Sequence, residues 1–224
     1  MKNSKPLVSI IMNCYNGEKF LLESILSVRQ QTYKNWELIF FDNFSSDNSI
    51  NIVKSIKDCR IKFYSTNKTH KLYKARNLAI KKTKGEYICF LDTDDYWNKN
   101  FLNQFIKKFN SEECSIVCSK YKVRNMKNHK IFDNVKRKLP KFLTTQNLLN
   151  DYTIGILAIM IKKKIFKKYK FNERYNVIGD FDLFIRLSSK YKIFSINKPL
   201  AIYRLHGENF SERKVKIYLS EIEF

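Results

Sequence analysis

Glycine and proline are scarce in this chain of 224 residues, which has only five and three of them. Long flexible linkers are therefore not expected, and the length suits one large domain, or two small ones, with a real hydrophobic core. No apolar run approaches 18 residues, so no membrane-spanning helix is expected. The polar start, residues 1–6, does not resemble a secretory signal peptide.

Several motifs of well-known enzyme classes are also missing. No Gly-x-Gly-x-x-Gly follows the first predicted strand, which disfavours a dinucleotide site, and the Gly-Lys-Ser/Thr of a P-loop is absent. Gly-x-Ser-x-Gly is absent, and the three histidines lie outside any obvious triad. The five cysteines have no zinc-site spacing, and Cys14 and Cys89 lie in apolar runs. We therefore expect reduced thiols and a cytoplasmic setting.

Positive charge is in excess, with 43 Lys and Arg against 21 Asp and Glu and a net charge of +22. Such a charge predicts attraction to polyanions, which include nucleic acid, anionic lipid headgroups and phosphorylated substrates. Lysines spread over a solvated surface would give the same composition. The basic residues are dense in 120–141, which we interpret as a mobile loop rather than a domain boundary.

Strand-like and helix-like segments alternate through the first hundred residues. Short apolar runs rich in β-forming residues predict strands, and apolar residues at helical spacing predict helices. The predicted strands are 7–12, 36–41, 60–65 and 87–91, with helices at 18–29, from 45–47 onward and around 72–79. Later strands are predicted at 154–161, 192–196 and 200–203, before a polar loop at 204–209. This alternation predicts an α/β fold with a Rossmann-like, mostly parallel central sheet flanked by helices.

Polar clusters follow three of these strands, at 13–16, 42–43 and 92–95. Carboxyl ends of parallel strands share one edge of a sheet, where open α/β sheets bind their ligands. Asp92 and Asp94 suit Mg²⁺ or Mn²⁺, which bind one or two carboxylates together with substrate phosphates. Such a metal would make a bridged diphosphate a good leaving group. A simpler interpretation is that one Asp caps the next helix and the others are solvated.

The ordered set of motifs resembles a family 2 glycosyltransferase of the GT-A fold. The matching stretches are 8–16, 37–47, Lys74-Ala75-Arg76-Asn77, 85–95, Gly179-Asp180-Phe181-Asp182 and Tyr203-Arg204-Leu205-His206. The resemblance implies a single domain with an acceptor-side C-terminal half. Residues 1–120 would bind the nucleotide-sugar, 121–210 would bind the acceptor and carry the catalytic base, and 211–224 would be a helical tail.

The resemblance also implies roles for individual side chains. The base and ribose would be held by Asn13, Tyr15 and Asp42, and Arg76 would lie near the base or diphosphate. Asp92 would meet the ribose and, together with Asp94, would bind the metal. A late loop with Arg204 and His206 would cover the diphosphate, and Asp180 would be the general base. Simpler structural interpretations remain: Tyr15 packing beside its strand, Asp42 or Asp180 capping a helix, Arg76 as a solvated charge and His206 as a plain loop residue. Three positions differ from many members of the family: Asn13 replaces a small hydroxyl residue, Phe44 replaces Gly, and Gly179 replaces Glu. Because Gly179 removes a carboxylate that could orient the acceptor, the acceptor is left unassigned.

The activity implied by the resemblance is a metal-dependent, inverting transfer of a hexosyl or N-acetylhexosaminyl group. The donor would be a nucleotide-sugar, expected to be a UDP-sugar, and the acceptor a hydroxyl of a glycan or glycolipid in surface polysaccharide or lipooligosaccharide synthesis. The cofactor would be Mn²⁺ or Mg²⁺. The basic stretches 120–141 and 162–170 are predicted to dock on anionic lipid at the inner face of the cytoplasmic membrane. Nucleic acid is not the expected partner.

Two other functions are compatible with parts of the sequence. A polyanion- or membrane-binding module would explain the charge and leave the acidic cluster a structural role. A nucleotidyltransferase would share the metal and nucleotide at the sheet edge and would release pyrophosphate.

Overall fold

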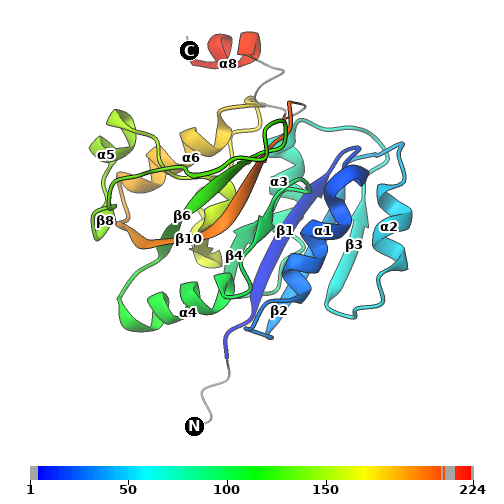
Figure 1. The fold of residues 1–224 in the computed structure, drawn as a ribbon, viewed down its shortest axis with the longest axis horizontal. Coiled ribbons are helices and arrows are strands. Elements are labelled where there is room, and N and C mark those ends of the chain that lie inside the picture. Colours follow the sequence, from blue (N-terminus) through cyan, green and yellow to red (C-terminus); the bar gives the residue numbers. More distant parts are fainter. Residues whose placement is uncertain (1–4, 208, 210–214, 223–224) are drawn as a thin grey trace.

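The computed structural model describes residues 5–207, 209 and 215–222. Within them, one mixed ten-stranded sheet is flanked by helices (Figure 1). The strands are β1 (Val8–Cys14), β2 (Trp36–Asp42), β3 (Ile61–Ser65), β4 (Tyr87–Phe90), β5 (Tyr96–Trp97), β6 (Ile116–Asn125), β7 (Ile131–Asp133), β8 (Phe142–Leu143), β9 (Ile159–Lys162) and β10 (Ile193–Leu205). The α-helices are α1 (Glu18–Arg29), α2 (Ser49–Ser55), α3 (Leu72–Ile80), α4 (Phe101–Ser111), α5 (Thr145–Asn150), α6 (Gly179–Ser188) and α8 (Val215–Ile222), and short 3₁₀ turns occupy Ile156–Ala158 and Lys163–Lys167.

The N-terminal half forms the parallel part of the sheet, in the order β3-β2-β1-β4. Every residue of β1, β2 and β4 is buried, as expected for parallel strands with both faces covered. The predicted βα alternation is confirmed here. The helix predicted from 45–47 begins later, at Ser49, because Asp42 and Asp47 bind the backbone amides between the strand and the helix.

The C-terminal half makes the sheet mixed. The predicted strand 154–161 is confirmed only in its last part: β9 begins at Ile159, after the 3₁₀ turn Ile156–Ala158, and lies antiparallel between β4 and β6. Strand β10 runs parallel to β6. The two predicted strands 192–196 and 200–203 form one strand, which includes Arg204, so this arginine is not in a loop. An irregularity between Ile196 and Ala201 interrupts the pairing of β10 with β6.

The prediction that 120–141 is a mobile loop is wrong for much of the segment. Strand β6 continues to Asn125, and β7 pairs with its last residues. The basic side chains concealed this strand in the sequence. Backbone pairing with β10 and β7 stabilises it, while its later side chains are only half-buried.

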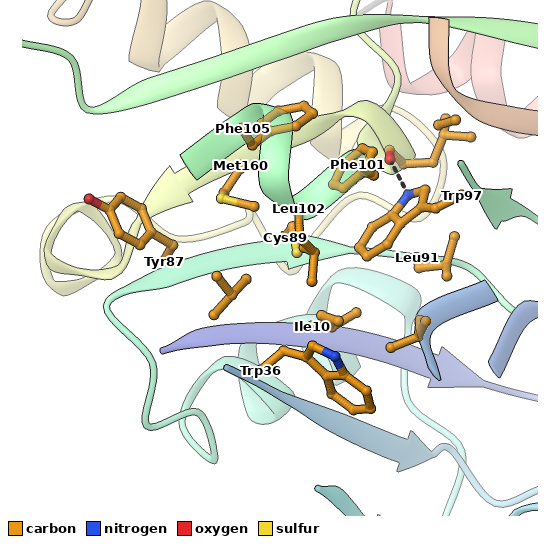
Figure 2. Packing of buried hydrophobic residues seen from close by; sticks show 14 of the residues in the cluster. Ile10, Trp36, Tyr87, Cys89, Leu91, Trp97, Phe101, Leu102, Phe105 and Met160 are labelled. Atoms are coloured by element: carbon orange, nitrogen blue, oxygen red, sulfur yellow. Dashed lines mark hydrogen bonds between the residues drawn. The ribbon is translucent and has the colours of Figure 1, made fainter. Parts of the chain in front are cut away.

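Apolar side chains from the helices pack on the sheet and support the loop after β4. Figure 2 shows Trp97, Phe101 and Phe105 together, with the indole Nε1 of Trp97 donating to the Leu157 carbonyl oxygen at 2.8 Å. The Trp97 and Phe101 rings stack with centroids 4.0 Å apart. The end of the loop that carries the three aspartates is thereby anchored in the core.

Cys14 and Cys89 are free and buried, as predicted. No helix in the described part of the chain is long and apolar enough to cross a membrane. Within the predicted tail 211–224, α8 is helical, and the remaining tail residues lie outside the described ones. The division of the domain at residue 120 stays a prediction.

Candidate active site

The polar ends of β1, β2 and β4 meet at one edge of the sheet, as predicted, and border a cleft of about 620 Å³. Helices α3 and α6 supply its other wall. The lining residues are Asn13, Tyr15, Asn43, Thr69, His70, Lys71, Leu72, Tyr73, Arg76, Asp92, Thr93, Asp94, Ile156, Asn176, Val177, Asp180, Tyr203 and Asn209. Six of the nine predicted site residues are therefore brought together, and Asp42, Arg204 and His206 lie outside the lining.

Asn13 and Tyr15 lie on the side of the cleft formed by β1. Asn13 is 9% exposed, and neither its Oδ1 nor its Nδ2 has a partner in the described structure. A buried amide without partners is costly, so this side chain is suited to a polar ligand. Tyr15 is 57% exposed and lines the cleft, so it does not simply pack beside its strand.

Asp42 is buried at the end of β2 and shapes the loop beside the cleft. Its Oδ2 accepts hydrogen bonds from the amides of Phe44 and Ser45, both at 3.1 Å, while Oδ1 has no partner among the described residues. Phe44 has a φ of +70°, in the left-handed region that favours glycine, which accounts for Gly being common at this position in the resembled family. Asp42 thus stabilises a strained turn, and it does not cap α2.

Arg76 and Asp92 form an ion pair inside the cleft. One Arg76 amino group donates to both Asp92 oxygens, at 2.8 and 3.0 Å. Arg76 is only 3% exposed, so it is not a solvated helix charge. Burial disfavours its positive charge, but Asp92, Tyr73 and Asp180 together outweigh this effect and raise the pKa of Arg76 above its ordinary value. Arg76 fixes the Asp92 carboxylate at the mouth of the cleft.

Two residues near the end of β10 hold the acidic loop in place. Arg204 is fully buried, and its guanidinium donates to the Asp94 carbonyl oxygen at 2.7 Å. His206 Nε2 lies 3.1 Å from Asp94 Oδ2, and its ring is 5.1 Å from that of Phe20. His206 is therefore more than a plain loop residue. Both side chains act on Asp94 rather than on the cleft directly.

Asp95 points away from the cleft into the protein. It is 1% exposed, and its Oδ1 accepts a hydrogen bond from the Arg204 amide at 2.9 Å. Burial, reinforced by Asp94 and Asp92, raises the pKa of this carboxyl well above its usual range. Asp95 is consequently a structural residue that joins the acidic loop to β10.

Asp180 lies in the first turn of α6 and faces the opposite wall of the cleft. Its Oδ1 accepts from the Phe181 amide at 2.9 Å and lies 3.2 Å from the Tyr73 hydroxyl. The N-cap of α6 is Ile178, so Asp180 is not the capping residue. Burial raises the pKa of Asp180, although Arg76 opposes this shift. A carboxylate with a raised pKa is suited to take up a proton near neutral pH.

The carboxylates of the cleft can hold a metal only with help from other ligands. Over the described ranges, no three His, Cys, Asp or Glu side chains are grouped to bind an ion by themselves. Asp92 and Asp94 are each partly exposed, with 33% and 29% of their side chains accessible. This arrangement fits Mg²⁺ or Mn²⁺, which commonly take one or two carboxylates and complete their coordination with phosphate oxygens and water.

Sequence reasoning missed the residues that surround Asp180. Tyr73 lies in the helix predicted around 72–79 but matches none of the motifs, and Asn176 and Val177 carried no motif. The amides of Asn176, Val177 and Ile178 donate to the Glu221 carboxylate of α8, at 2.6, 3.0 and 3.0 Å. These contacts join segments more than 40 residues apart, which no local pattern could reveal.

Comparisons with known proteins agree with this geometry. The sequence model described as "Glycosyl transferase family 2" matches residues 9–170. UDP-Glc:alpha-D-GlcNAc-diphosphoundecaprenol beta-1,3-glucosyltransferase WfgD of Escherichia coli is 34% identical over 212 residues, covering 94% of this chain and 81% of that protein. The putative teichuronic acid biosynthesis glycosyltransferase TuaG of Bacillus subtilis is 27% identical over 96% of this chain and 86% of its own.

Among solved structures, S. aureus TarS 1-349 in complex with UDP-GlcNAc superimposes with a TM-score of 0.77 and 22% identity. The match covers 92% of this chain and 60% of that one. At this identity the likeness concerns the fold, and it confirms the predicted GT-A type of α/β architecture.

Proposed function

Since this chain belongs to glycosyl transferase family 2 and is a glycosyltransferase, we propose that it transfers a sugar from a UDP-sugar to a hydroxyl of a lipid-linked glycan, with inversion at the anomeric carbon. One observation carries the proposal. Asp180, a carboxylate with a raised pKa, lies in the same cleft as the polar ends of three strands. A base and a nucleotide-diphosphate site would thus face each other across the space for the transferred sugar.

Asp180 would act as the general base. The acceptor oxygen attacks the anomeric carbon from the face opposite the diphosphate, its proton passes to Asp180, and the bond between the sugar and the diphosphate breaks. The Tyr73 hydroxyl and the Phe181 amide, which both lie against Oδ1, hold the carboxyl group in one orientation. The burial that raises its pKa also brings its proton affinity closer to that needed near neutral pH.

The donor would bind along β1, β2 and the acidic loop. The unpartnered amide of Asn13 and the exposed ring of Tyr15 suit a uracil base and ribose. Asp42 Oδ1 is buried without a partner, so its contact with the base requires the Phe44 loop to adjust. Arg76 would act on the donor chiefly through Asp92, since it is nearly inaccessible to solvent.

The proposed metal is Mn²⁺ or Mg²⁺, held by Asp94 with Asp92. When bound, it would neutralise the charge that develops on the departing diphosphate. His206 and Arg204 would keep Asp94 facing the metal, through the contact at Nε2 and the contact to the backbone carbonyl. Arg204 and His206 therefore support the donor site from behind.

The acceptor is inferred from the relatives. WfgD is named for a GlcNAc-diphosphoundecaprenol acceptor, and TuaG for teichuronic acid biosynthesis. We place this chain in the same kind of pathway, the synthesis of a surface polysaccharide, as a hexosyl- or N-acetylhexosaminyl-transferase. Such an acceptor is embedded in a bilayer, so the enzyme would work as a peripheral protein at the cytoplasmic face of the membrane.

A thermal-shift panel of nucleotide-sugars, each with and without Mn²⁺, tests the donor and the metal together. Binding of a ligand to the folded state alone raises Tm. We expect a UDP-sugar with Mn²⁺ to raise Tm most, and Asp94→Asn to remove the contribution of the metal while leaving that of the nucleotide. A flat response across the panel would contradict the proposal.

A nucleotidyltransferase would use the same cleft but break a different bond. It would release pyrophosphate, whereas a glycosyltransferase releases UDP. Measuring both products in one reaction separates the two, and the family match together with the UDP-Glc donor named for WfgD favours UDP.

A further inference from the structure

Strands β6 and β7 form a hairpin within the sheet, and its turn lies beside the candidate active site. Its strands pair Lys122 with Asp133, Val123 with Phe132 and Arg124 with Ile131. The Asn125 amide donates to the Lys130 carbonyl oxygen at 2.9 Å and closes the turn. The hairpin is therefore an ordered element with a defined set of exposed side chains.

The outer part of this hairpin combines positive charge with exposed apolar side chains. Residues 127–133 are all exposed, and Ile131 and Phe132 are 55% and 49% accessible. The longer stretch 120–141 holds nine Lys and Arg but only one acidic residue, Asp133. Exposed apolar residues flanked by lysines are typical of surfaces that enter the headgroup region of an anionic bilayer.

The hairpin adjoins the open edge of the candidate site. The Met126 amide donates to the Leu205 carbonyl oxygen at 2.9 Å, and the next residue, His206, contacts Asp94. A Cβ placed on Gly207 would lie 3.2 Å from Lys127 Cε, so the turn also packs against the segment after β10. Any surface that binds the hairpin turn would therefore lie close to the mouth of the cleft.

The second basic stretch, 162–170, does not share this surface. The Lys162 amide donates to Ser115, immediately before β6, whereas the hairpin turn follows Asn125 at the far end of the same ten-residue strand. At about 3.3 Å per residue, the two ends lie roughly 30 Å apart. The prediction of one docking surface from 120–141 and 162–170 is thus corrected for the hairpin turn, which lies at the opposite end of β6 from 162–170. Lys141, paired with Glu112, lies at the same end as 162–170.

We propose that the outer hairpin, residues 127–132, is the membrane-docking element of this protein, and that its partner is a bilayer containing anionic phospholipid. The lysines would attract the headgroups, and Ile131 and Phe132 would enter the region between headgroups and acyl chains. This inference rests on the proposed function, because the role given to docking is to present a lipid-linked acceptor to the cleft. Charge alone would also suit nucleic acid, but the two exposed apolar side chains favour a bilayer.

Vesicle co-sedimentation of the full chain tests this inference without using turnover. The probes are vesicles of phosphatidylcholine alone and with phosphatidylglycerol, at low salt. We expect binding only to the anionic vesicles. Lys127→Gln with Lys130→Gln should weaken it about 30-fold, since each lysine near the surface contributes roughly 1 kcal/mol. Ile131→Ser with Phe132→Ser should weaken it by about tenfold or more.

Matched controls are available elsewhere on the chain. Lys164→Gln with Lys167→Gln removes the same charge near the opposite end of β6, and Leu22→Ser removes a side chain that is 50% exposed on α1. Both should bind vesicles as the wild type does. The inference is overturned if these controls lose as much binding as the hairpin variants, or if the wild type fails to bind anionic vesicles.

A third arm uses a single-stranded oligonucleotide to represent polyanions in general. If the lysine variants lose both ligands equally and Ile131→Ser with Phe132→Ser loses neither, the hairpin is a general polyanion surface and the membrane assignment is wrong. UDP affinity, measured on the same samples, reports the donor site separately. A failure of docking can therefore be distinguished from a failure of the proposed function.

Discussion

The ring of Tyr73 occupies the space that a side chain at Gly179 would need. A Cβ added there would lie 2.4 Å from Tyr73 Cδ2, a distance that no real contact allows. The same tyrosine brings its hydroxyl to 3.2 Å from Asp180 Oδ1 and 2.7 Å from the Val177 carbonyl oxygen. Glycine at 179 and tyrosine at 73 are therefore a matched pair, and Tyr73 can act on Asp180 because residue 179 has no side chain.

Tyr73→Phe should move the pH dependence of transfer. The hydroxyl favours the ionised form of Asp180, so its loss should raise the pKa of that carboxyl. A general base acts when deprotonated, so the acid limb of kcat/KM should move to higher pH when this hydrogen bond is lost. Tyr64→Phe, on β3, is the matched control. An acid limb that stays in place or moves to lower pH would contradict the role given to Tyr73.

Glu221→Gln should lower kcat and leave donor binding intact. The Glu221 carboxylate accepts three backbone amides just before α6, so a side-chain NH₂ in its place would oppose one of them and loosen the segment that leads to Asp180. Displacement of a catalytic group by 1 Å can cost about 100-fold, and we expect kcat to fall at least tenfold. UDP affinity should stay unchanged, because Asn13 and Tyr15 lie on the other wall.

Ser220→Ala on the same helix is the control for Glu221, since among the described residues the Ser220 hydroxyl donates to the Ile217 carbonyl within α8. An equal loss of kcat in this control, or a parallel loss of UDP affinity in Glu221→Gln, would show that α8 supports the whole fold rather than the position of Asp180.

Asp95→Asn should have a larger free energy of unfolding than the wild type, and this difference should grow as pH rises. Burial, then Asp94 and Asp92, raise the pKa of Asp95 in the folded state, so the folded protein retains a proton that the unfolded chain releases above about pH 4. The free energy of unfolding of the wild type therefore falls as pH rises through this range. Asn keeps the acceptor for the Arg204 amide and cannot ionise.

Urea unfolding of both proteins at pH 4 and pH 8 measures this effect. The advantage of Asp95→Asn should be larger at pH 8. An advantage that is the same at both values, or larger at pH 4, would mean that Asp95 is ionised in the folded protein, paired with the buried Arg204.

The parallel half of the fold and the place of the cleft could be predicted from the sequence because both have local causes. Continuous apolar runs mark β1, β2 and β4, and each is followed at once by its polar cluster. The burial of Arg76 could not be read in the same way. On a helix rich in Lys and Arg it resembles its exposed neighbours, and only the tertiary contact with Asp92 distinguishes it.

Other features depend on pairing between distant segments. Strand β6 carries basic residues typical of a loop, and its hydrogen bonds go to β10, more than 70 residues later. Arg204 resembled a loop residue for the same reason, because the irregular pairing around Pro199 hides the continuity of β10 in the sequence. Tyr73 lies outside every sequence motif, and its role depends on the absence of a side chain at Gly179.

The most direct test of the account compares Asp180→Asn with the wild type in sugar transfer and in UDP binding. The reaction uses the UDP-sugar that stabilises the protein most and a lipid-linked GlcNAc diphosphate acceptor. The control is Asp182→Asn, because Asp182 is on the same helix but pairs with Arg186 and is not among the residues that line the cleft. We predict that Asp180→Asn binds UDP like the wild type but transfers sugar at least 100-fold more slowly. Transfer within a few-fold of the wild-type rate would contradict the assignment of Asp180 as the general base.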